Sequence, residues 1–278
     1  MSISLHYNSA AGFVRQNLEK ATFDTGRHSQ RLSTGVKINS ASDDAAGLGL
    51  SKKISAQVSS SDMAKNNVQT GVNMLQTLDS DLAVIGDILQ RRRDLAVQSA
   101  NGVYSGSERR MLDSEYVELG HAVYQVLQSS SFLDNKLMQG GSIALQAGTN
   151  NTSSDRINFD LPDGYSDSAI FDTYDTDNHI DSDIGARACI QFMDAGLDWV
   201  SQKRGAVGAT INSLSSRISR TDSRQDNLSD AASNIVDADM AVESAGLTKG
   251  QILKQSSVSL LQQVNKTSGE TALTLLKQ

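Results

Sequence analysis

Apolar residues recur at alternating intervals of three and four along the first half of the chain. The clearest stripe consists of Leu75, Leu78, Leu82, Ile85 and Leu89. This spacing places the five side chains on one face of an α-helix. We expect the helix to begin near residue 42 and to continue to about Ala100, where Asn101-Gly102 is a stop signal. At 1.5 Å per residue such a helix is on the order of 80 Å long.

Two further stretches repeat this pattern. A helix is expected from about Ser107 to Ser129, with a stripe formed by Leu112, Tyr116, Leu119, Val123 and Val126. Another is expected from about 184 to 236, with a stripe formed by Val207, Ile211, Leu214 and Ile218 and continued by Leu228, Ala232 and Ile235. Three such seams pack as a left-handed, coiled-coil-like bundle. The predicted fold class is mainly α: an elongated coiled-coil-like helical bundle with long terminal helices and a small β-hairpin-containing insertion.

The insertion occupies about residues 130 to 183, between the second and third predicted helices. Gly140-Gly141 precedes the stretches SIALQAG and RINFDLPDGY, which read as short strands. Pro162-Asp163-Gly164 is a turn signal. The sequence therefore predicts a small β-rich element between long helices.

The two ends of the chain carry narrow apolar stripes on otherwise polar helices. The stripe residues that we assign to a core between the ends are Val14, Leu18, Leu260, Leu261, Val264 and Leu275. The remaining positions are rich in uncharged Ser, Gln, Asn and Thr. Because an isolated helix of this kind is marginal in water, each end is expected to fold only when it pairs with another surface.

The stretch SASDDAAGLGLSKKI, residues 40–54, marks the expected start of the first long helix. Ser40 or Ser42 is predicted to cap it, with Asp43 three residues after Ser40 as in a capping box. Asp43 and Asp44 would then lie in the first turn, where the helix dipole favours carboxylates. The small residues that follow, Ala45, Ala46, Gly47 and Gly49, indicate close approach of other backbones.

Composition and charge narrow the functional classes. The 278 residues include one proline and 5% aromatic residues, which suits long helices better than a thick globular core. A net charge of −7 argues against nucleic acid as a partner. The run Arg91-Arg92-Arg93 is interpreted as a solvated or salt-bridged helix face. The single cysteine, Cys189, is interpreted as a small apolar core residue.

Targeting signals are lacking in the sequence. No stretch approaches the ~18 apolar residues of a membrane-spanning helix, so membrane insertion is not expected. The first residues, MSISLHYNSAAGFVRQN, have neither a basic region nor an apolar one of the secretory type. These signals alone predict a cytoplasmic protein.

Few residues in the sequence are candidates for catalysis or for metal binding. The four histidines are scattered, and no metal-ligand, phosphate-binding or nucleophile motif is found, so we predict no enzymatic activity and no cofactor or metal. An acidic stretch contains Asp172, Asp175, Asp177, Asp181 and Asp183. It lacks the sixth-position glycine of a calcium loop, and Ala186 stands where the final glutamate belongs. We interpret it as a solvated acidic loop, with weak calcium binding as the alternative.

Five motifs in order carry a resemblance to a known family. They are RLSTGVKINSASDDAAGLGLSKKI (31–54), LQRRRDLAVQSANG (89–102), RGAVGATINSL (204–214), NIVDADMAVES (234–244) and QILKQSSVSLLQQVN (251–265). These motifs are similar to those of bacterial flagellins, and the resemblance covers about residues 1–148 and 184–278. The chain thus resembles a flagellin with a small variable region.

The resemblance implies a structural protein that self-assembles into the flagellar filament for motility. It implies an extracellular location, reached by the flagellar export route without a cleaved signal peptide. The implied partners are other copies of the chain, the export chaperone, the filament cap and the hook–filament junction proteins. The vertebrate innate flagellin receptor is a further candidate partner.

The resemblance also implies a domain layout. Residues 1–41 would form the N-terminal inner-tube helix and spoke, and residues 237–278 the C-terminal inner-tube helix. Residues 42–183 would form the N-terminal part of the outer bundle, insertion included, and residues 184–236 its C-terminal helix. The spoke region that contacts neighbouring subunits would include Ser42, Asp43, Asp44, Ala45, Ala46 and Gly47.

Family positions for receptor recognition and lattice packing correspond to Arg91, Leu95 and Glu115. The motif departs from the commonest pattern at Arg92, where an apolar residue is usual, and at Asp94, which replaces glutamate. Two alternatives stay open from the sequence. One is a hook–filament junction protein; the other is a flagellin with an inserted enzyme domain, for which some fifty residues leave little room.

Overall fold

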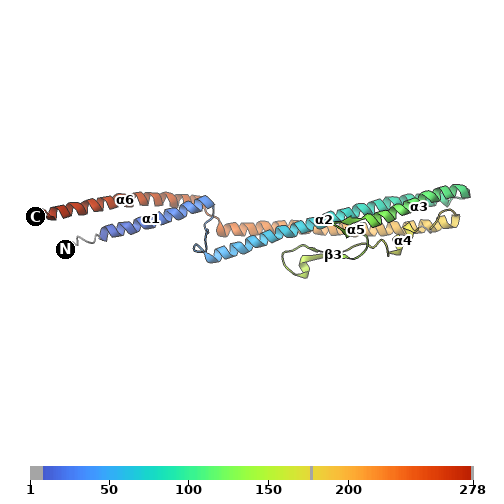
Figure 1. Ribbon diagram of the computed structural model, residues 1–278, viewed down its shortest axis with the longest axis horizontal. Helices are drawn as coiled ribbons and strands as arrows, with labels where there is room; N and C mark the ends of the chain where they lie inside the picture. The colour runs from blue at the N-terminus through green and yellow to red at the C-terminus, as the bar shows by residue number, and fades with distance from the viewer. Residues whose placement is uncertain (1–8, 176–177, 277–278) are drawn as a thin grey trace. The chain divides into compact units, whose positions relative to one another are not determined.

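Long helices dominate the computed structural model, which describes residues 9–175 and 178–276. The helices are α1 (Ser9–Thr34), α2 (Ala45–Ser99), α3 (Gly106–Ser129), α4 (Ser168–Tyr174), α5 (Asp183–Val236) and α6 (Met240–Leu276) (Figure 1). The mainly α fold with long terminal helices is therefore confirmed. In the described part of the chain, no helix is both long enough and apolar enough to cross a membrane.

The chain divides into two compact units. The terminal unit combines Met1–Ala56 with Asn227–Gln278, and the central unit comprises Gln57–Asp226. Helices α2 and α5 each contribute to both units. The unit boundaries thus fall inside these two helices.

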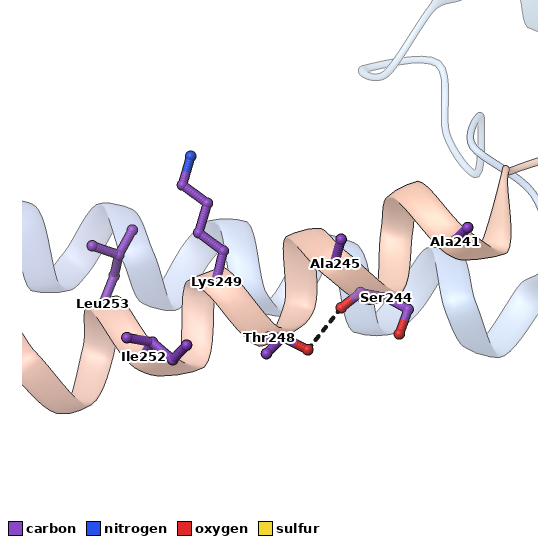
Figure 2. A pocket seen from close by; sticks show the side chains of 7 residues that line it. All are labelled: Ala241, Ser244, Ala245, Thr248, Lys249, Ile252 and Leu253. Atoms are coloured by element: carbon purple, nitrogen blue, oxygen red, sulfur yellow. Dashed lines mark hydrogen bonds between the residues drawn. The ribbon is translucent and has the colours of Figure 1, made fainter.

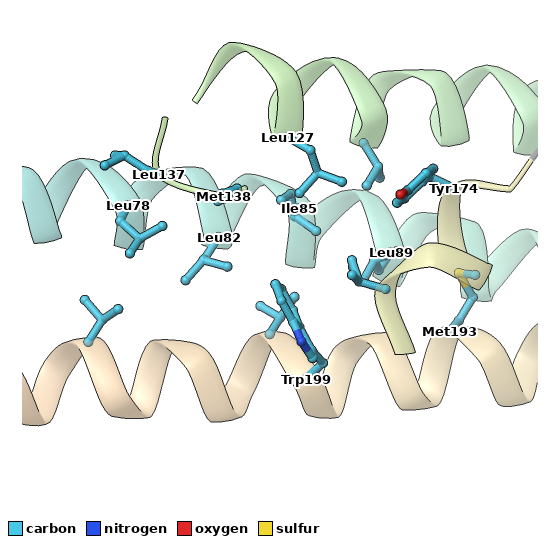
Figure 3. Packing of buried hydrophobic residues seen from close by; sticks show 14 of the residues in the cluster. Leu78, Leu82, Ile85, Leu89, Leu127, Leu137, Met138, Tyr174, Met193 and Trp199 are labelled. Atoms are coloured by element: carbon cyan, nitrogen blue, oxygen red, sulfur yellow. The ribbon is translucent and has the colours of Figure 1, made fainter. Parts of the chain in front are cut away.

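The core of the central unit lies where α2, α3 and α5 pack together (Figure 3). The predicted α2 stripe from Leu75 to Leu89 is completely buried. Tyr116 and Val123 of α3 and Val207 and Leu214 of α5 are buried in the same cluster. Each fully buried residue of this size contributes roughly 1.5–3 kcal/mol by removal of apolar surface from water. The periodicity of the sequence therefore identified the central seam.

The turn between α2 and α3 is closed by polar contacts. Ser105 caps α3 in a capping box with Glu108: each side chain accepts a hydrogen bond from the backbone N–H of the other. The buried Arg109 donates to the carbonyl oxygens of Ser99 and Asn101, which lie at and beyond the end of α2. Arg109 thus supplies donors to carbonyls that a helix end leaves without partners.

Two antiparallel hairpins form the predicted β part of the insertion. The first pairs β1 (Ser131–Phe132) with β2 (Asn135–Lys136). The second pairs β3 (Ser142–Gln146) with β4 (Arg156–Asp160), in a register that sets Ser142 opposite Asp160 and Gln146 opposite Arg156. A short 3₁₀ turn, η1 (Ser153–Asp155), precedes β4. The expected hairpin is confirmed.

A short helix, α4, replaces part of the expected β structure. Asp167 caps it by accepting from the backbone N–H of Ala169 at 3.2 Å. The other Asp167 oxygen accepts from Nε1 of Trp199 in α5 at 2.7 Å. The Asp167 carboxylate therefore caps α4 and also hydrogen-bonds it to α5 of the bundle. Since Ile170 of α4 is fully buried, this segment belongs to the core rather than to a surface loop.

In the terminal unit, α1 and α6 lie side by side (Figure 1). The end of α1 is joined to the chain before α6 by an isolated antiparallel bridge between Val36 and Asp237. The Lys37 N–H donates to the Val236 carbonyl at 2.7 Å, and the Ala238 N–H donates to the Gly35 carbonyl at 2.9 Å. Gly35 has a φ of 74°, a left-handed conformation that glycine adopts without strain.

Candidate assembly surfaces

The start of α2 differs from the sequence prediction. The helix begins at Ala45, and Asp44 caps it by accepting from the Gly47 N–H at 2.9 Å. The predictions of a start near residue 42 and of a cap by Ser40 or Ser42 are therefore wrong. A carboxylate placed just before the first helical residue reaches the third N–H of the helix, and Asp44 occupies that place.

Asp43 organises the loop before α2 instead of joining the helix. Its Oδ2 accepts from the Ser40 N–H at 3.0 Å and from the Asn39 N–H at 3.2 Å. The Ser40 hydroxyl also donates to Asp43, and this bond is the largest cause of a lowered pKa of the Asp43 carboxyl. Arg27 lies 3.5 Å from the same carboxylate. Asp43 thus accepts the hydrogen bonds that stabilise the loop between α1 and α2.

The small residues of the spoke region serve two different purposes. A Cβ on Gly47 would lie 2.5 Å from Oδ2 of Asp44 and 2.8 Å from Cδ1 of Ile38. A larger residue at position 47 would therefore displace the Asp44 cap or the Ile38 side chain within the same chain. By contrast, Ser42, Ala45 and Ala46 are exposed. These exposed positions leave backbone accessible to another molecule.

One face of α6 is apolar and open to solvent. Ala241, Ala245, Thr248, Ile252 and Leu253 lie along it, and together with Ser244 and Lys249 they line a shallow groove of about 630 Å³ (Figure 2). Ile252 is 62% exposed and Leu253 is 48% exposed. The exposure of these two large apolar side chains makes the face a candidate interaction surface.

The residues assigned to a core between the chain ends are only partly covered. Val14, Leu18, Leu261 and Val264 are half-buried, and Leu260 is 49% exposed. The side chain of Leu275 lies outside the described residues. The α1–α6 pair thus leaves much of its apolar surface in contact with water, and the expectation of a core at these positions stays a proposal.

A nearly buried carboxylate joins α1 to α6. Glu243 of α6 hydrogen-bonds Nδ1 of His28 at 2.5 Å through Oε2 and accepts from Nη1 of Arg31 at 3.1 Å through Oε1. The His28 bond, followed by the Arg31 contact, holds the pKa of Glu243 below its ordinary value. A Cβ on Gly246 would lie 2.5 Å from the His28 ring, so glycine at this position makes room for the imidazole.

Arg91 and Glu115 meet across α2 and α3. Nε and Nη2 of Arg91 donate to Oε1 of Glu115 at 2.9 and 2.6 Å. The two side chains are 55% and 46% exposed. Leu95, by contrast, is only 1% exposed and belongs to the core cluster. In the single chain Leu95 therefore lies in the core beneath this pair, and its part in recognition stays a prediction.

Two family descriptions match most of the chain. The bacterial flagellin N-terminal helical region matches residues 5–142, and the bacterial flagellin C-terminal helical region matches residues 190–275. The chain belongs to the bacterial flagellin family. It is therefore a structural protein of the flagellar filament, an extracellular appendage, and not an enzyme.

Curated relatives agree with this flagellin assignment over nearly their full length. A flagellin of Halalkalibacterium halodurans is 35% identical over 239 residues, which cover 85% of this chain and 86% of the relative. A flagellin of Listeria monocytogenes is 32% identical and covers 92% of each chain. Flagellin FlaB1 of Treponema pallidum is 29% identical and covers 98% of this chain and 99% of the relative. A solved structure, Bacillus cereus flagellin, is 25% identical and covers 56% of this chain and 88% of that one, with a TM-score of 0.49.

The arginine run of this flagellin has one member that the sequence interpretation placed incorrectly. Arg91 pairs with Glu115 of α3, and Nε of Arg93 donates to Asp194 of α5 at 2.6 Å, so each forms a salt bridge as predicted, on a different side of α2. Arg92 is only 1% exposed, and its guanidinium packs against Gly120 and the Tyr116 ring. Three consecutive helical residues point in directions about 100° apart, so one of them must face the bundle.

The acidic stretch before α5 is used for structure. Asp183 begins α5 and pairs with Arg187 at 3.1 Å, while His179 pairs with Asp113 of α3 at 2.8 Å. Asp177 lies outside the described residues. Within the described ranges, no cluster of three or more His, Cys, Asp or Glu side chains is arranged to hold a metal ion.

Cys189 is buried, and burial raises the pKa of its thiol.

Proposed function

We propose that copies of this chain form the filament by burying the apolar faces of α1 and α6 against neighbouring copies. The observation that carries the proposal is the open face of α6, with Ile252 and Leu253 exposed at one end of its groove. Burial of such surface is the main driving force for association. The half-buried state of Val14, Leu18, Leu261 and Val264 supports a terminal unit that completes its packing only in the polymer.

The proposed layout assigns the chain ends to the inner tube. Residues 1–41 and 237–278 form the tube and its spoke, and residues 42–183 and 184–236 form the outer bundle with the insertion. The division into a terminal and a central unit supports a two-part arrangement, although the units divide within α2 and α5 rather than at their ends. The exposed Ser42, Ala45 and Ala46 are proposed to contact neighbouring copies.

The proposed partners include components of flagellar assembly. The chain would leave the cell by the flagellar route without a cleaved signal peptide, bound first by an export chaperone, and then join the filament beneath its cap and beyond the hook–filament junction. The vertebrate innate flagellin receptor is a proposed partner of the monomer through Arg91 and Glu115. Both side chains are exposed and form a salt bridge with each other, so a receptor can contact their charged groups.

Seeded elongation tests the proposed assembly face. Purified monomer is mixed with short filament seeds and examined by electron microscopy. The variant Ile252→Gln/Leu253→Gln removes apolar contact from α6 and is expected to abolish elongation. Ile184→Gln, at an 83% exposed apolar position of α5, is the matched control and should elongate normally. Normal filaments from the double variant would rule out this face.

A deletion tests whether the ends fold on assembly. Removal of residues 260–278 takes away the second half of α6 and leaves the central unit intact. The shortened chain should retain a cooperative melt from the central unit but fail to polymerise. If it polymerises normally, coupled folding of the terminal unit is wrong. Wild-type protein that binds filament ends without elongating them would favour the junction-protein alternative.

A further inference from the structure

A small pocket of the central unit is lined by three arginines of one helix. Arg217, Arg220 and Arg224 lie three and four residues apart on α5 and so share a face. The pocket has a volume of about 200 Å³ and is more enclosed than the α6 groove. The rest of its lining comes from α2 and from the turn between β3 and β4: Ser61, Ala64, Ala147, Gly148, Thr149, Asp155 and, on α5, Thr221.

Two of these guanidinium groups, those of Arg220 and Arg224, belong to exposed residues. Arg217 donates through Nη1 to the Ser154 carbonyl at 3.2 Å and thereby holds the turn against α5. Arg220 and Arg224 make no hydrogen bond or ion pair with any residue in the described part of the chain. A guanidinium carries five N–H donors, so the pocket presents a large unused donor capacity.

Two acidic residues beside this part of α5 bind other side chains. Asp222 accepts from Nζ of Lys65 in α2 at 2.6 Å. Asp62, on α2, accepts from the side chain of Gln225 at 2.9 Å. Both contacts join α2 to α5 beside the pocket. Neither carboxylate forms an ion pair with Arg220 or Arg224.

Among the described residues that line the pocket, Asp155 supplies a carboxylate, and its oxygens accept hydrogen bonds from, or pack against, the turn. Oδ2 accepts from the Asn150 N–H at 3.0 Å. Oδ1 lies over Gly148, close enough that a side chain at position 148 would overlap it. The carboxylate therefore stabilises the loop that forms one wall. Three arginines against one aspartate leave the pocket cationic, although the whole chain carries a net charge of −7.

We infer that this pocket binds an oxyanion. Guanidinium groups recognise carboxylate and phosphate oxygens through paired N–H donors, and the Thr149 and Thr221 hydroxyls supply further polar contacts. The volume suits an anion the size of phosphate or the end of one acidic side chain. The oxyanion can therefore come from solution, or from a carboxylate of a neighbouring copy in the filament. The site is independent of the α6 face proposed for assembly.

Titration of full-length monomer with inorganic phosphate tests the site. Isothermal calorimetry is performed at constant ionic strength, with chloride as the balancing anion. Wild type should bind saturably, and Arg220→Gln should weaken binding at least about fivefold, because a hydrogen bond to a charged group is lost. Arg110→Gln removes the same charge at an exposed position of α3 and should leave binding unchanged. Circular dichroism verifies that both variants are folded.

Two results would overturn the site: no saturable phosphate binding by wild type, or equal losses in Arg220→Gln and Arg110→Gln. Seeded elongation then distinguishes the source of the oxyanion. If a neighbour's carboxylate fills the pocket, Arg220→Gln should raise the monomer concentration needed for elongation, and phosphate should inhibit wild type. If the oxyanion comes from solution, Arg220→Gln should elongate like Arg110→Gln. The calorimetric result stands even if the α6 face proves not to drive assembly.

Discussion

The guanidinium carbon of Arg92 lies 3.8 Å from the centroid of the Tyr116 ring, inside the central bundle. Among the described residues, Nε and Nη1 of Arg92 and the Tyr116 hydroxyl have no hydrogen-bond partner. Burial lowers the pKa of Arg92 and raises that of Tyr116, because each charged form is disfavoured away from water. The cation–π attraction stabilises the pair by up to about 2 kcal/mol, which does not replace the lost hydration of a cation.

Replacement of Arg92 by an apolar residue should therefore stabilise the protein. Arg92→Met keeps an unbranched side chain against Gly120 and removes the buried charge. We expect the free energy of unfolding of the central unit to rise by about 1–2 kcal/mol in guanidinium denaturation. Arg93→Met is the control: it removes only an exposed pair with Asp194 and should lower that free energy by less than about 1 kcal/mol. A less stable Arg92→Met would contradict this account.

Two glycines of α5 should respond oppositely to alanine. A Cβ on Gly196 would lie 2.5 Å from Cγ2 of the buried Thr173 and 3.1 Å from Cδ1 of Leu89. Gly196→Ala is expected to destabilise the protein by about 1–3 kcal/mol through overpacking. No atom lies within 4 Å of a Cβ on Gly205, so Gly205→Ala should be stabilising by about 0.5–1 kcal/mol. Thermal melts of both variants measure the difference, and equal shifts would refute it.

The pairing of α1 with α6 should weaken in acid. Because the pKa of Glu243 is lowered in the folded state, its contribution is complete above the ordinary value of 4.5 and is lost as the pH falls through the lowered value. Glu243→Gln should melt at a lower temperature than wild type at neutral pH, by an amount equivalent to about 1–3 kcal/mol. The gap between the two melts should narrow below about pH 4.5.

Melts followed by circular dichroism across this pH range test the Glu243 prediction. Glu19→Gln removes an exposed carboxylate from α1 and serves as the control for charge. It should follow wild type at every pH. A gap between wild type and Glu243→Gln that does not change with pH would show that the carboxylate does not carry the effect.

Substitutions of Arg91 and Leu95 should have different effects on the free energy of unfolding. Leu95→Ala opens a cavity in the core and is expected to cost 2–5 kcal/mol, on the order measured for buried leucines. Arg91→Ala breaks an exposed pair and should cost less than about 1 kcal/mol. Denaturant unfolding measures both.

In a cell-based receptor assay, Arg91→Ala monomer should lose signalling while its unfolding curve stays close to that of wild type. Glu115→Ala, which removes the other half of the pair, should act in the same direction. Full signalling by both variants would exclude this surface from recognition.

Helix periodicity was sufficient to predict the main architecture. The repeated spacing of Leu75, Leu78 and Leu82 placed the seam correctly, since a long amphipathic helix has only one way to bury such a stripe. The predicted bounds of 184–236 and 107–129 differ from those of α5 and α3 by one residue at their starts. Hairpin signals around Pro162 and Gly140 correctly placed turns and short strands.

The local details depended on contacts that the sequence does not display. Ser40, Ser42 and Asp44 are all good caps, and the choice of Asp44 follows from the loop that Asp43 builds. The helix α4 depends on Asp167 and Trp199, which are 32 residues apart. The burial of Arg92 was hidden because adjacent arginines suggest a solvated surface. The arginine pocket was missed because its walls come from three separate segments.

The β3–β4 hairpin has a consequence for ligands with more than one binding head. Each copy carries one such hairpin, held by five residue pairs that run from Ser142–Asp160 to Gln146–Arg156. A homopolymer repeats it at a fixed spacing. Two linked heads that each bind the hairpin weakly gain from the proximity of the second site, and their combined affinity can rise 10²–10⁴-fold, on the order seen for multivalent binding. The affinity of such a ligand for the monomer therefore reports the binding of one head. Its affinity for the filament is higher, because both heads bind at the same time.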